Sequence, residues 1–289
     1  MPYARSGDCH LYWTSIGSGP TLVLIRGLAR SHRYFQPIVP YLARYFRVVL
    51  FDNRGAGRSD RPRGPYSSAQ MADDVIAVMD AAGARDAWLL GMSLGGMIAL
   101  DVARRHPARV AGLVLGSCTP RGKGYPVRVP LWPKLLLAIS ALLPRSVGRR
   151  IQAFVTLSDA FIDRADAVMD RWDVLAAEDA PRIRDLLAHL AAIRSHDSVG
   201  WLDTIRQPTL VMAGEDDRLV PPANSRYLAE RMPNAELEVI AHCGHNIETE
   251  QPGWMARRIL CFVDEHAEAY ASQAPASTTG TLMSAPSAR

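Results

Sequence analysis

The chain has 289 residues, of which 48% are hydrophobic and 21% carry a charge. These fractions are near the average for globular proteins, so they exclude wholesale disorder and a bundle of membrane helices. The formal net charge of +4 is too small to indicate a nucleic-acid partner. The length permits one domain or two, and a single body that carries one insertion fits best.

Targeting and redox signals are weak along the chain. Residues 1–10 lack the apolar core of a secretory signal, and no apolar run reaches the roughly 20 residues that a membrane span needs. We therefore expect a cytoplasmic protein without stable membrane insertion. The most apolar stretch, Leu131–Leu143, predicts a buried or interfacial helix. The four cysteines lie far apart and form no C-x-x-C pair: Cys9, Cys118, Cys243 and Cys261. This spacing predicts four free thiols and neither a zinc site nor a redox motif.

Short apolar runs alternate with helical segments. The runs predict strands buried on both faces of a sheet, at Leu22–Ile25, Val48–Phe51, Ala87–Leu90, Val110–Leu115, Leu210–Ala213 and Leu237–Ile240. His10–Thr14 predicts an antiparallel strand at the sheet edge, and helices are predicted over Ala69–Ala82 and Met97–His106. The alternation indicates an α/β fold, with helices on both faces of a mostly parallel sheet.

The alternation stops between Pro120 and Pro208, where apolar residues recur at helical spacing and no strand is indicated. A structureless loop of this length inside a compact domain would be unusual, so we predict a helical cap at 120–207, inserted into a core of residues 1–119 and 208–270. We expect the larger apolar residues of the cap to form mainly its own small core, while some face the cleft: Trp132, Leu135, Leu136, Phe154, Phe161 and Trp172.

Two segments stand out by composition. Residues 102–158 contain Lys and Arg but no Asp or Glu. A solvated basic face is the favoured interpretation, and attraction of an anionic substrate or membrane surface is the alternative. After residue 270 the composition shifts to Ala, Ser, Thr, Pro and Gly, which predicts a disordered tail at 271–289.

Residues 91–95 read G-M-S-L-G between a predicted strand and a predicted helix. This setting is typical of a nucleophile elbow, with Ser93 on a tight turn that exposes its hydroxyl. Such a turn crowds the positions two before and two after the serine, where Gly91 and Gly95 leave room. The unpaired N–H groups at the start of the helix favour negative charge there. The alternative is that Ser93 is an ordinary helix N-cap.

A serine hydroxyl needs a base, and the base needs a partner that fixes its tautomer. Asp216 and Asp217 follow the predicted strand Leu210–Ala213, and His245 follows the predicted strand Leu237–Ile240. Both groups therefore stand at carboxyl ends of strands, where open α/β sheets place their ligands. A turn aspartate and a loop histidine are the alternative interpretations. A thiol nucleophile at Cys243 is disfavoured because its neighbours match no thiol-enzyme pattern.

Three further motifs make the chain, up to about residue 267, resemble the α/β-hydrolase family. Residues 51–60 read F-D-N-R-G-A-G-R-S-D and are similar to the family's D-x-R-G-x-G-x-S loop. Residues 214–221 resemble the acid motif G-x-x-D-x-x-x-P, which selects Asp217 over Asp216. Residues 244–252 resemble the motif G-H-x-x-x-x-E-x-P, which selects His245 over His242. The resemblance implies an eight-stranded sheet and a triad of Ser93, His245 and Asp217 that needs no metal or organic cofactor.

The chain departs from the family pattern after the third strand, where Arg26-Gly27 replaces the usual His-Gly. The resemblance implies an oxyanion hole formed by the backbone N–H groups of Leu28 and Leu94, which does not depend on the replaced side chain. We interpret Arg26 as a local structural variation, and a cation that favours an anionic substrate is the alternative. The side chains of Asp52, Arg54 and Ser59 are expected to brace their loop rather than touch substrate.

Together these features predict a serine hydrolase that cleaves a carboxylic ester of a small to medium, partly apolar molecule through an acyl-enzyme. The same triad serves enol-lactonases, carbon–carbon bond hydrolases and cofactor-free perhydrolases, and a fold does not determine a substrate. A lactonase is the first alternative, favoured if Arg26 and the basic cap guide a carboxylate. A non-catalytic small-molecule receptor and a membrane-surface lipase are further alternatives. The sequence does not indicate the oligomeric state.

Overall fold

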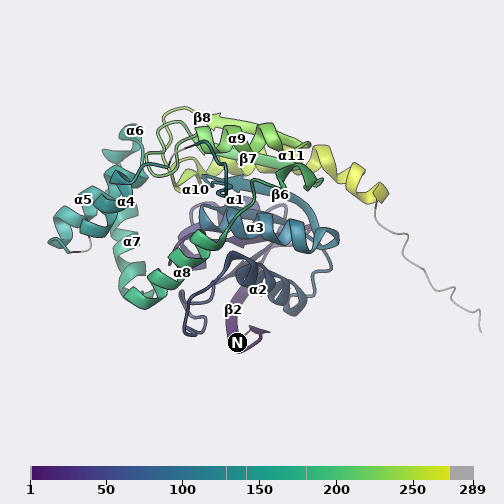
Figure 1. The fold of residues 1–289 in the computed structure, drawn as a ribbon, viewed down its shortest axis with the longest axis horizontal. Helices are drawn as coiled ribbons and strands as arrows, with labels where there is room; N and C mark the ends of the chain where they lie inside the picture. Colours follow the sequence, from purple (N-terminus) through teal and green to yellow (C-terminus); the bar gives the residue numbers. More distant parts are fainter. Residues whose placement is uncertain (1, 128, 141, 180, 274–289) are drawn as a thin grey trace, which may run out of the picture.

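The computed structural model describes residues 2–127, 129–140, 142–179 and 181–273. Its centre is an eight-stranded sheet with the strand order β1-β2-β4-β3-β5-β6-β7-β8 (Figure 1). The strands are β1 (Tyr3–Ser6), β2 (Cys9–Ile16), β3 (Thr21–Ile25), β4 (Arg47–Phe51), β5 (Ala87–Met92), β6 (Val110–Gly116), β7 (Thr209–Gly214) and β8 (Ala235–Ile240). β2 is antiparallel to both of its neighbours, and the other pairs are parallel, which confirms the predicted sheet.

Helices cover both faces of this sheet. They are α1 (Val39–Leu42), α2 (Ser68–Ala81), α3 (Leu94–Arg105), α4 (Trp132–Ser140), α5 (Arg145–Thr156), α6 (Asp159–Ile162), α7 (Asp166–Asp179), α8 (Ile183–Ser195), α9 (Ala223–Arg231), α10 (Ile247–Glu250) and α11 (Pro252–Gln273). Short 3-10 helices occupy His32–Phe35, Pro107–Arg109 and Leu202–Thr204. The predicted helices Ala69–Ala82 and Met97–His106 correspond to α2 and α3.

Two hydrophobic cores result from the alternation of side chains along each strand. Val23 and Ile25 of β3 point to the face covered by α2, α3 and α9. Leu22 and Leu24 point to the opposite face, which α1 and α11 cover. Central strands buried on both faces therefore appear in the sequence as continuous apolar runs. On α2, the apolar residues that share one face are buried: Met71, Val75, Val78 and Met79.

Two predictions about the sheet edges are wrong. His10–Thr14 lies in an antiparallel strand, but β1 pairs outside it and forms the edge. The sequence of β1, Y-A-R-S, is too short and polar to give an apolar run. Leu237–Ile240 lies in β8, whose residues are only partly buried because β8 is the opposite edge and pairs with β7 alone.

In the described residues between β6 and β7, five α-helices, α4 to α8, are followed by the 3-10 helix Leu202–Thr204, and no strand interrupts residues 120–207 there. We propose that this segment is the cap. α4 to α7 gather on one side of the molecule, and α8 returns toward α2 and the sheet (Figure 1). α11 continues through residues 271–273, so the tail predicted from residue 271 overlaps this helix, and residues 274–289 lie outside the described part of the chain.

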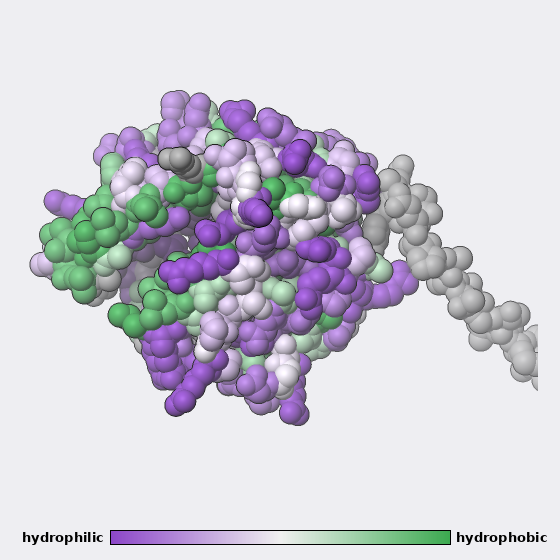
Figure 2. All heavy atoms as spheres, in the orientation of Figure 1, coloured by the Kyte–Doolittle hydropathy of each residue, from purple (hydrophilic) through white to green (hydrophobic). Residues whose placement is uncertain are grey.

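A small core formed mainly by the proposed cap includes Trp172, with Phe161 packed against it, and Tyr34 from outside the cap joins this core. The prediction that the larger apolar residues form the core of the cap is wrong for Trp132, Leu135 and Phe154, which are 46%, 62% and 40% exposed. The reason is that α4 packs against α5 and leaves its other face in contact with solvent. Figure 2 shows the resulting apolar surface over α4 and α5. The described residues of the stretch Leu131–Leu143 are therefore largely exposed, which contradicts a buried helix but not an interfacial one. No helix in the described residues is long and apolar enough to span a membrane.

Candidate active site

Ser93 lies on the turn between β5 and α3, with a φ of 56° and a ψ of −119°. A positive φ is uncommon for a residue other than glycine, and residues in such strained conformations cluster at functional sites. The flanking glycines make this turn possible. A Cβ atom on Gly95 would lie 2.0 Å from the Ile25 carbonyl oxygen, and one on Gly91 would lie 2.4 Å from the Gly95 oxygen. Ser93 occupies the N-cap position of α3, but its side chain makes no capping hydrogen bond there, which argues against an ordinary N-cap role.

Asp217 and His245 form a buried pair at the carboxyl ends of β7 and β8. Asp217 Oδ2 lies 2.8 Å from His245 Nδ1. The other carboxylate oxygen, Oδ1, accepts hydrogen bonds from the backbone N–H groups of Leu219 and Val220 at 2.9 and 2.8 Å. Because a carboxylate only accepts, Nδ1 of His245 carries the donated hydrogen, and in a neutral imidazole Nε2 is then the acceptor. The pair therefore has the tautomer that a general base requires.

The two competing residues lack this geometry. Among the described residues, the Asp216 side chain makes no hydrogen bond or ion pair with a histidine. His242 is exposed, and among the described residues it makes no hydrogen bond to a carboxylate. The choice of Asp217 and His245 that the resemblance implies is therefore consistent with the hydrogen bonds of the loops.

Ser93 follows a strand of the same parallel sheet that carries Asp217 and His245, so all three residues lie at its carboxyl edge. In the described part of the chain no hydrogen bond joins Ser93 to His245. Such bonds are often long in enzymes without substrate and shorten only in the reacting complex. The arrangement thus brings together an acid–base pair and places the predicted nucleophile at the same edge.

The loop after β3 runs directly beside Ser93. A Cβ atom on Gly27 would lie 3.7 Å from the Ser93 hydroxyl oxygen. The backbone N–H groups of Leu28 and Leu94, the predicted oxyanion donors, have no acceptor among the described residues. Free N–H groups beside a nucleophile are suited to binding developing negative charge.

Arg26 is buried and paired, although it replaces a histidine of the family pattern. Its Nη1 donates to the Glu248 carboxylate, and its Nη2 donates to Asn246 Oδ1 at 3.2 Å. The guanidinium also lies 5.0 Å from the centre of the Phe35 ring. A buried cation needs a counter-charge, and here the loop that carries His245 supplies it. These contacts support the structural interpretation of Arg26, which connects the two loops.

The loop at 51–60 is braced as predicted. Arg54 makes a buried two-bond ion pair with Asp74, at 2.6 and 2.5 Å. Asp52 accepts backbone hydrogen bonds from His32 and Arg58 at 2.7 and 2.9 Å. The Ser59 hydroxyl donates to the Asp52 carbonyl oxygen at 2.5 Å. These side chains are engaged within the protein and hold the loop beside β3.

Glu250 supports the His245 loop, a role that the sequence analysis did not assign. One carboxylate oxygen accepts from the Gly244 N–H at 2.9 Å. The other accepts from the Ser158 N–H and hydroxyl at 3.1 and 2.6 Å. Burial raises the pKa of this carboxyl, and the hydrogen bonds oppose that shift. Glu250 is the glutamate of the motif at 244–252, so a signal existed, but its partner in the proposed cap, Ser158, could not be read from the sequence.

His189 of α8 supports the other side of the site. Its Nδ1 accepts from the Ala29 N–H at 3.1 Å, and its Nε2 lies 2.7 Å from the Arg54 carbonyl oxygen. Burial lowers the pKa of this imidazole, which favours the neutral form that these bonds require. A lone histidine on a helix gives no sequence signal, so this contact between the cap and the loop after β3 could not be predicted.

Other candidate groups do not form competing sites. All four cysteines are in the described residues and unpaired, and burial together with nearby carboxylates raises the pKa of the Cys243 thiol, which disfavours a thiolate. Three side chains that could ligate a metal, Glu236, Glu265 and His266, lie close together at β8 and α11. Glu236 already pairs with Arg258, and His266 Nδ1 lies 2.9 Å from a backbone carbonyl oxygen.

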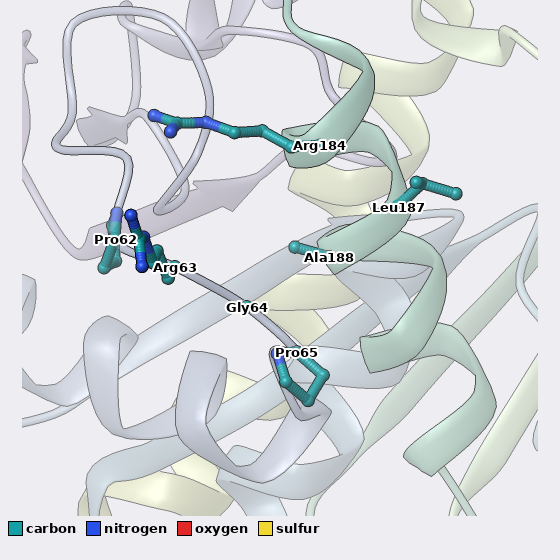
Figure 3. A pocket seen from close by; sticks show the side chains of 7 residues that line it. All are labelled: Pro62, Arg63, Gly64, Pro65, Arg184, Leu187 and Ala188. Atoms are coloured by element: carbon teal, nitrogen blue, oxygen red, sulfur yellow. The ribbon is translucent and has the colours of Figure 1, made fainter.

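A surface hollow of about 450 Å³ lies between residues 62–65 and α8 (Figure 3). Its lining consists of Pro62, Arg63, Gly64, Pro65, Arg184, Leu187 and Ala188. None of these residues can act as a serine-type nucleophile or as a neutral base. The hollow is therefore separate from the chemistry at the carboxyl edge of the sheet.

Comparison with known proteins agrees with this geometry. Residues 20–250 match the family described as the alpha/beta hydrolase fold. A relative from Azorhizobium caulinodans, RutD, is 31% identical over 271 residues, which cover 92% of this chain and 99% of the relative. RutD is named there as a carbamate hydrolase, and the name marks this activity as provisional.

Solved structures are similar as well. Est816, described as an N-acyl homoserine lactone degrading enzyme, has a TM-score of 0.76 at 28% identity, covering 91% of this chain and 100% of that one. The esterase RhEst1 from Rhodococcus sp. ECU1013 has a TM-score of 0.78 at 25% identity, covering 91% and 98%. The family match spans most of the sheet and all three predicted triad positions. The chain therefore belongs to the α/β-hydrolase family and is a hydrolase of that fold.

Proposed function

We propose that this hydrolase cleaves carboxylic esters of small to medium, partly apolar molecules through an acyl-enzyme. The observation that carries the proposal is the strained turn at Ser93, at the sheet edge where Asp217 orients His245. The backbone at Ser93 is strained, and two close-packed glycines permit this strain. The strain is explained if the turn exposes the Ser93 hydroxyl as a nucleophile. The similarity to an esterase and to a lactone-degrading enzyme supports the same bond class.

Each residue has a defined role in the proposed reaction. His245 Nε2 takes the proton of the Ser93 hydroxyl as its oxygen attacks the ester carbonyl. The N–H groups of Leu28 and Leu94 stabilise the oxyanion, and Asp217 stabilises the imidazolium. His245 then protonates the departing alcohol, which leaves an acyl group on Ser93. Water activated by the same histidine releases the acid and regenerates the serine.

Carbamate hydrolysis is the second candidate, because relatives that span nearly the whole chain carry that name. The same groups could attack a carbamate carbonyl, but nitrogen donates electrons into that carbonyl and makes it less reactive. Lactone hydrolysis needs no different residue, since a lactone is an ester whose alcohol stays attached to its acid.

A substrate panel separates these candidates. We would compare p-nitrophenyl butyrate, γ-butyrolactone and phenyl carbamate, and would label the protein with a fluorophosphonate and locate the adduct by mass spectrometry. The proposal predicts an adduct on Ser93 and the highest kcat/KM for an ester or lactone. A higher kcat/KM for the carbamate would replace the first candidate by the second. A folded protein with neither adduct nor turnover would contradict both and would favour a receptor.

A further inference from the structure

Three arginines lie in the segment that follows β3, and they differ in their partners. Arg26 is paired with Glu248. Arg33 is paired with Glu178, and Asp179 lies 3.9 Å away. Among the described residues Arg30 makes no ion pair, and its Nη1 is buried without a hydrogen-bond acceptor. Glu248 and Asp179 each keep one buried carboxylate oxygen without a hydrogen-bond partner among the described residues, and the charge of Glu248 acts on Arg30 without forming an ion pair.

The surroundings of Arg30 hold its cation without neutralising it. The guanidinium carbon lies 4.7 Å from the centre of the Tyr34 ring and 4.4 Å from the centre of the Trp172 ring. The aromatic rings attract the cation electrostatically but offer it no hydrogen-bond acceptor in these positions. Nη1 is buried without an acceptor, and burial lowers the pKa of Arg30 to about 10. A buried N–H group without a partner needs an explanation.

The position of Arg30 relates it to the candidate active site. It follows Leu28 by two residues, and Gly27 lies against Ser93. On the other side, Tyr34 and Trp172 belong to the cap core that includes Leu157, and Gly244 packs against the Leu157 backbone. Arg30 thus packs against Trp172 of α7 and lies near enough to Arg26 and Glu248 for their charges to act on it.

We propose that Arg30 binds a carboxylate on the substrate, so that the enzyme acts on esters or lactones that carry an anionic group. The planar guanidinium can donate two parallel hydrogen bonds to a carboxylate, and the Tyr34 and Trp172 rings lie against it. Partial desolvation strengthens such a pair relative to one in water. This inference rests on the proposed ester hydrolysis, which it narrows to a substrate class.

Matched esters test the inference. p-Nitrophenyl butyrate and the p-nitrophenyl monoester of succinate have acyl chains of the same length, and only the second carries a carboxylate. The readout is the ratio of kcat/KM for the succinate ester to that for the butyrate ester. Arg30→Gln is expected to lower this ratio by roughly tenfold to a hundredfold, the range for one charge-assisted contact. Arg33→Gln, which removes a cation whose partners are known, is the control and should leave the ratio unchanged.

A binding measurement separates the failure of this inference from the failure of the proposed function. Calorimetry with succinate and with succinamide measures binding and needs no turnover. We expect the wild type to bind succinate but not succinamide. We expect Arg30→Gln to bind succinate at least tenfold more weakly than the wild type does. Ester turnover with an unchanged ratio would overturn the inference and keep the proposed function. Succinate binding that depends on Arg30 without ester turnover would keep the anion site and overturn the esterase. Neither turnover nor succinate binding would overturn both.

Folding of the variant is controlled by circular dichroism. If Arg30→Gln does not fold, Arg30→Lys keeps the charge but cannot donate two parallel hydrogen bonds. Arg30→Lys is expected to lower the ratio of kcat/KM values by less than tenfold, whereas Arg33→Gln should not lower it. A ratio for Arg30→Lys equal to that of the wild type would overturn the inference.

Discussion

At the scale of single residues, the Asp217 carboxylate is fully engaged: one oxygen contacts His245 and the other accepts two backbone N–H groups. These bonds fix both the rotamer of the acid and the tautomer of the base. They also distinguish Asp217 from its neighbour Asp216, which the strand pattern alone could not separate.

Asp217→Asn should therefore impair catalysis without disturbing the loop. An amide can donate to Nδ1, which favours the wrong imidazole tautomer, and in serine-protease triads this change lowers kcat by roughly ten-thousandfold. Steady-state kinetics on the best p-nitrophenyl ester would measure it. Asp216→Asn is the matched control and should change kcat by less than about threefold. The opposite order of effects would transfer the role to Asp216.

The Arg26–Glu248 pair gives a second prediction at this scale. Glu248→Gln leaves the Arg26 charge buried without a counter-charge, and breaking a buried pair from one side typically costs about 3–5 kcal/mol of unfolding free energy. Replacing both residues by methionine removes both charges and should cost less than Glu248→Gln alone.

Urea denaturation would measure these changes. Glu236→Gln is the control, since Glu236 makes a more exposed pair with Arg258, and it should cost no more than about 1 kcal/mol. A cost below about 0.5 kcal/mol for Glu248→Gln would mean that the Arg26 cation does not depend on this carboxylate.

At the scale of elements, α8 ties the cap to the loop that carries the predicted oxyanion donor. His189 makes this connection, with Asp185 and Arg61 as the nearest charges. The pKa of His189 is lowered in the folded state by burial, so below the ordinary pKa of histidine the unfolded chain binds more protons than the folded one. Stability from this group is therefore present above the ordinary pKa and is lost as the pH falls.

We expect the wild type to lose more unfolding free energy between pH 7 and pH 5 than His189→Gln, by up to about 1.4 kcal/mol per pH unit. Glutamine can accept and donate as the neutral imidazole does, but it does not titrate. Thermal or urea unfolding at the two pH values would measure the difference. His242→Asn, at an exposed position, should behave as the wild type does. Identical pH dependence in His189→Gln and the wild type would contradict the role of this histidine.

The turn at Ser93 shows why one element of the site could be predicted and another could not. Strand, elbow and helix follow one another directly, so residues 91–95 contain the whole signal. The contact of His189 with Ala29 spans 160 residues, and that of Arg26 with Glu248 spans 222. Such partners are chosen by the packing of the cap and the loops, which no local pattern encodes.

At the scale of the whole molecule, the central strands were predictable because burial on both faces leaves a continuous apolar run. The edge strands were not predictable in this way. β1 has no continuous apolar run, and β8 contains an apolar run although its residues are only partly buried. In the cap, helical spacing predicted the helices but not their environment. The apolar residues of α4 could pack inward or face solvent, and Figure 2 shows that many face solvent.

Hydrolysis of p-nitrophenyl acetate, butyrate, octanoate and palmitate by the wild type and by Ser93→Ala tests the central claim most directly, with both proteins confirmed to be folded by circular dichroism. The account predicts turnover of at least one ester by the wild type and a loss of roughly a millionfold in kcat for Ser93→Ala. The preferred chain length would then report the size of the cleft. Equal turnover by the two proteins, or turnover by neither, would contradict the assignment of Ser93 as the nucleophile of an esterase.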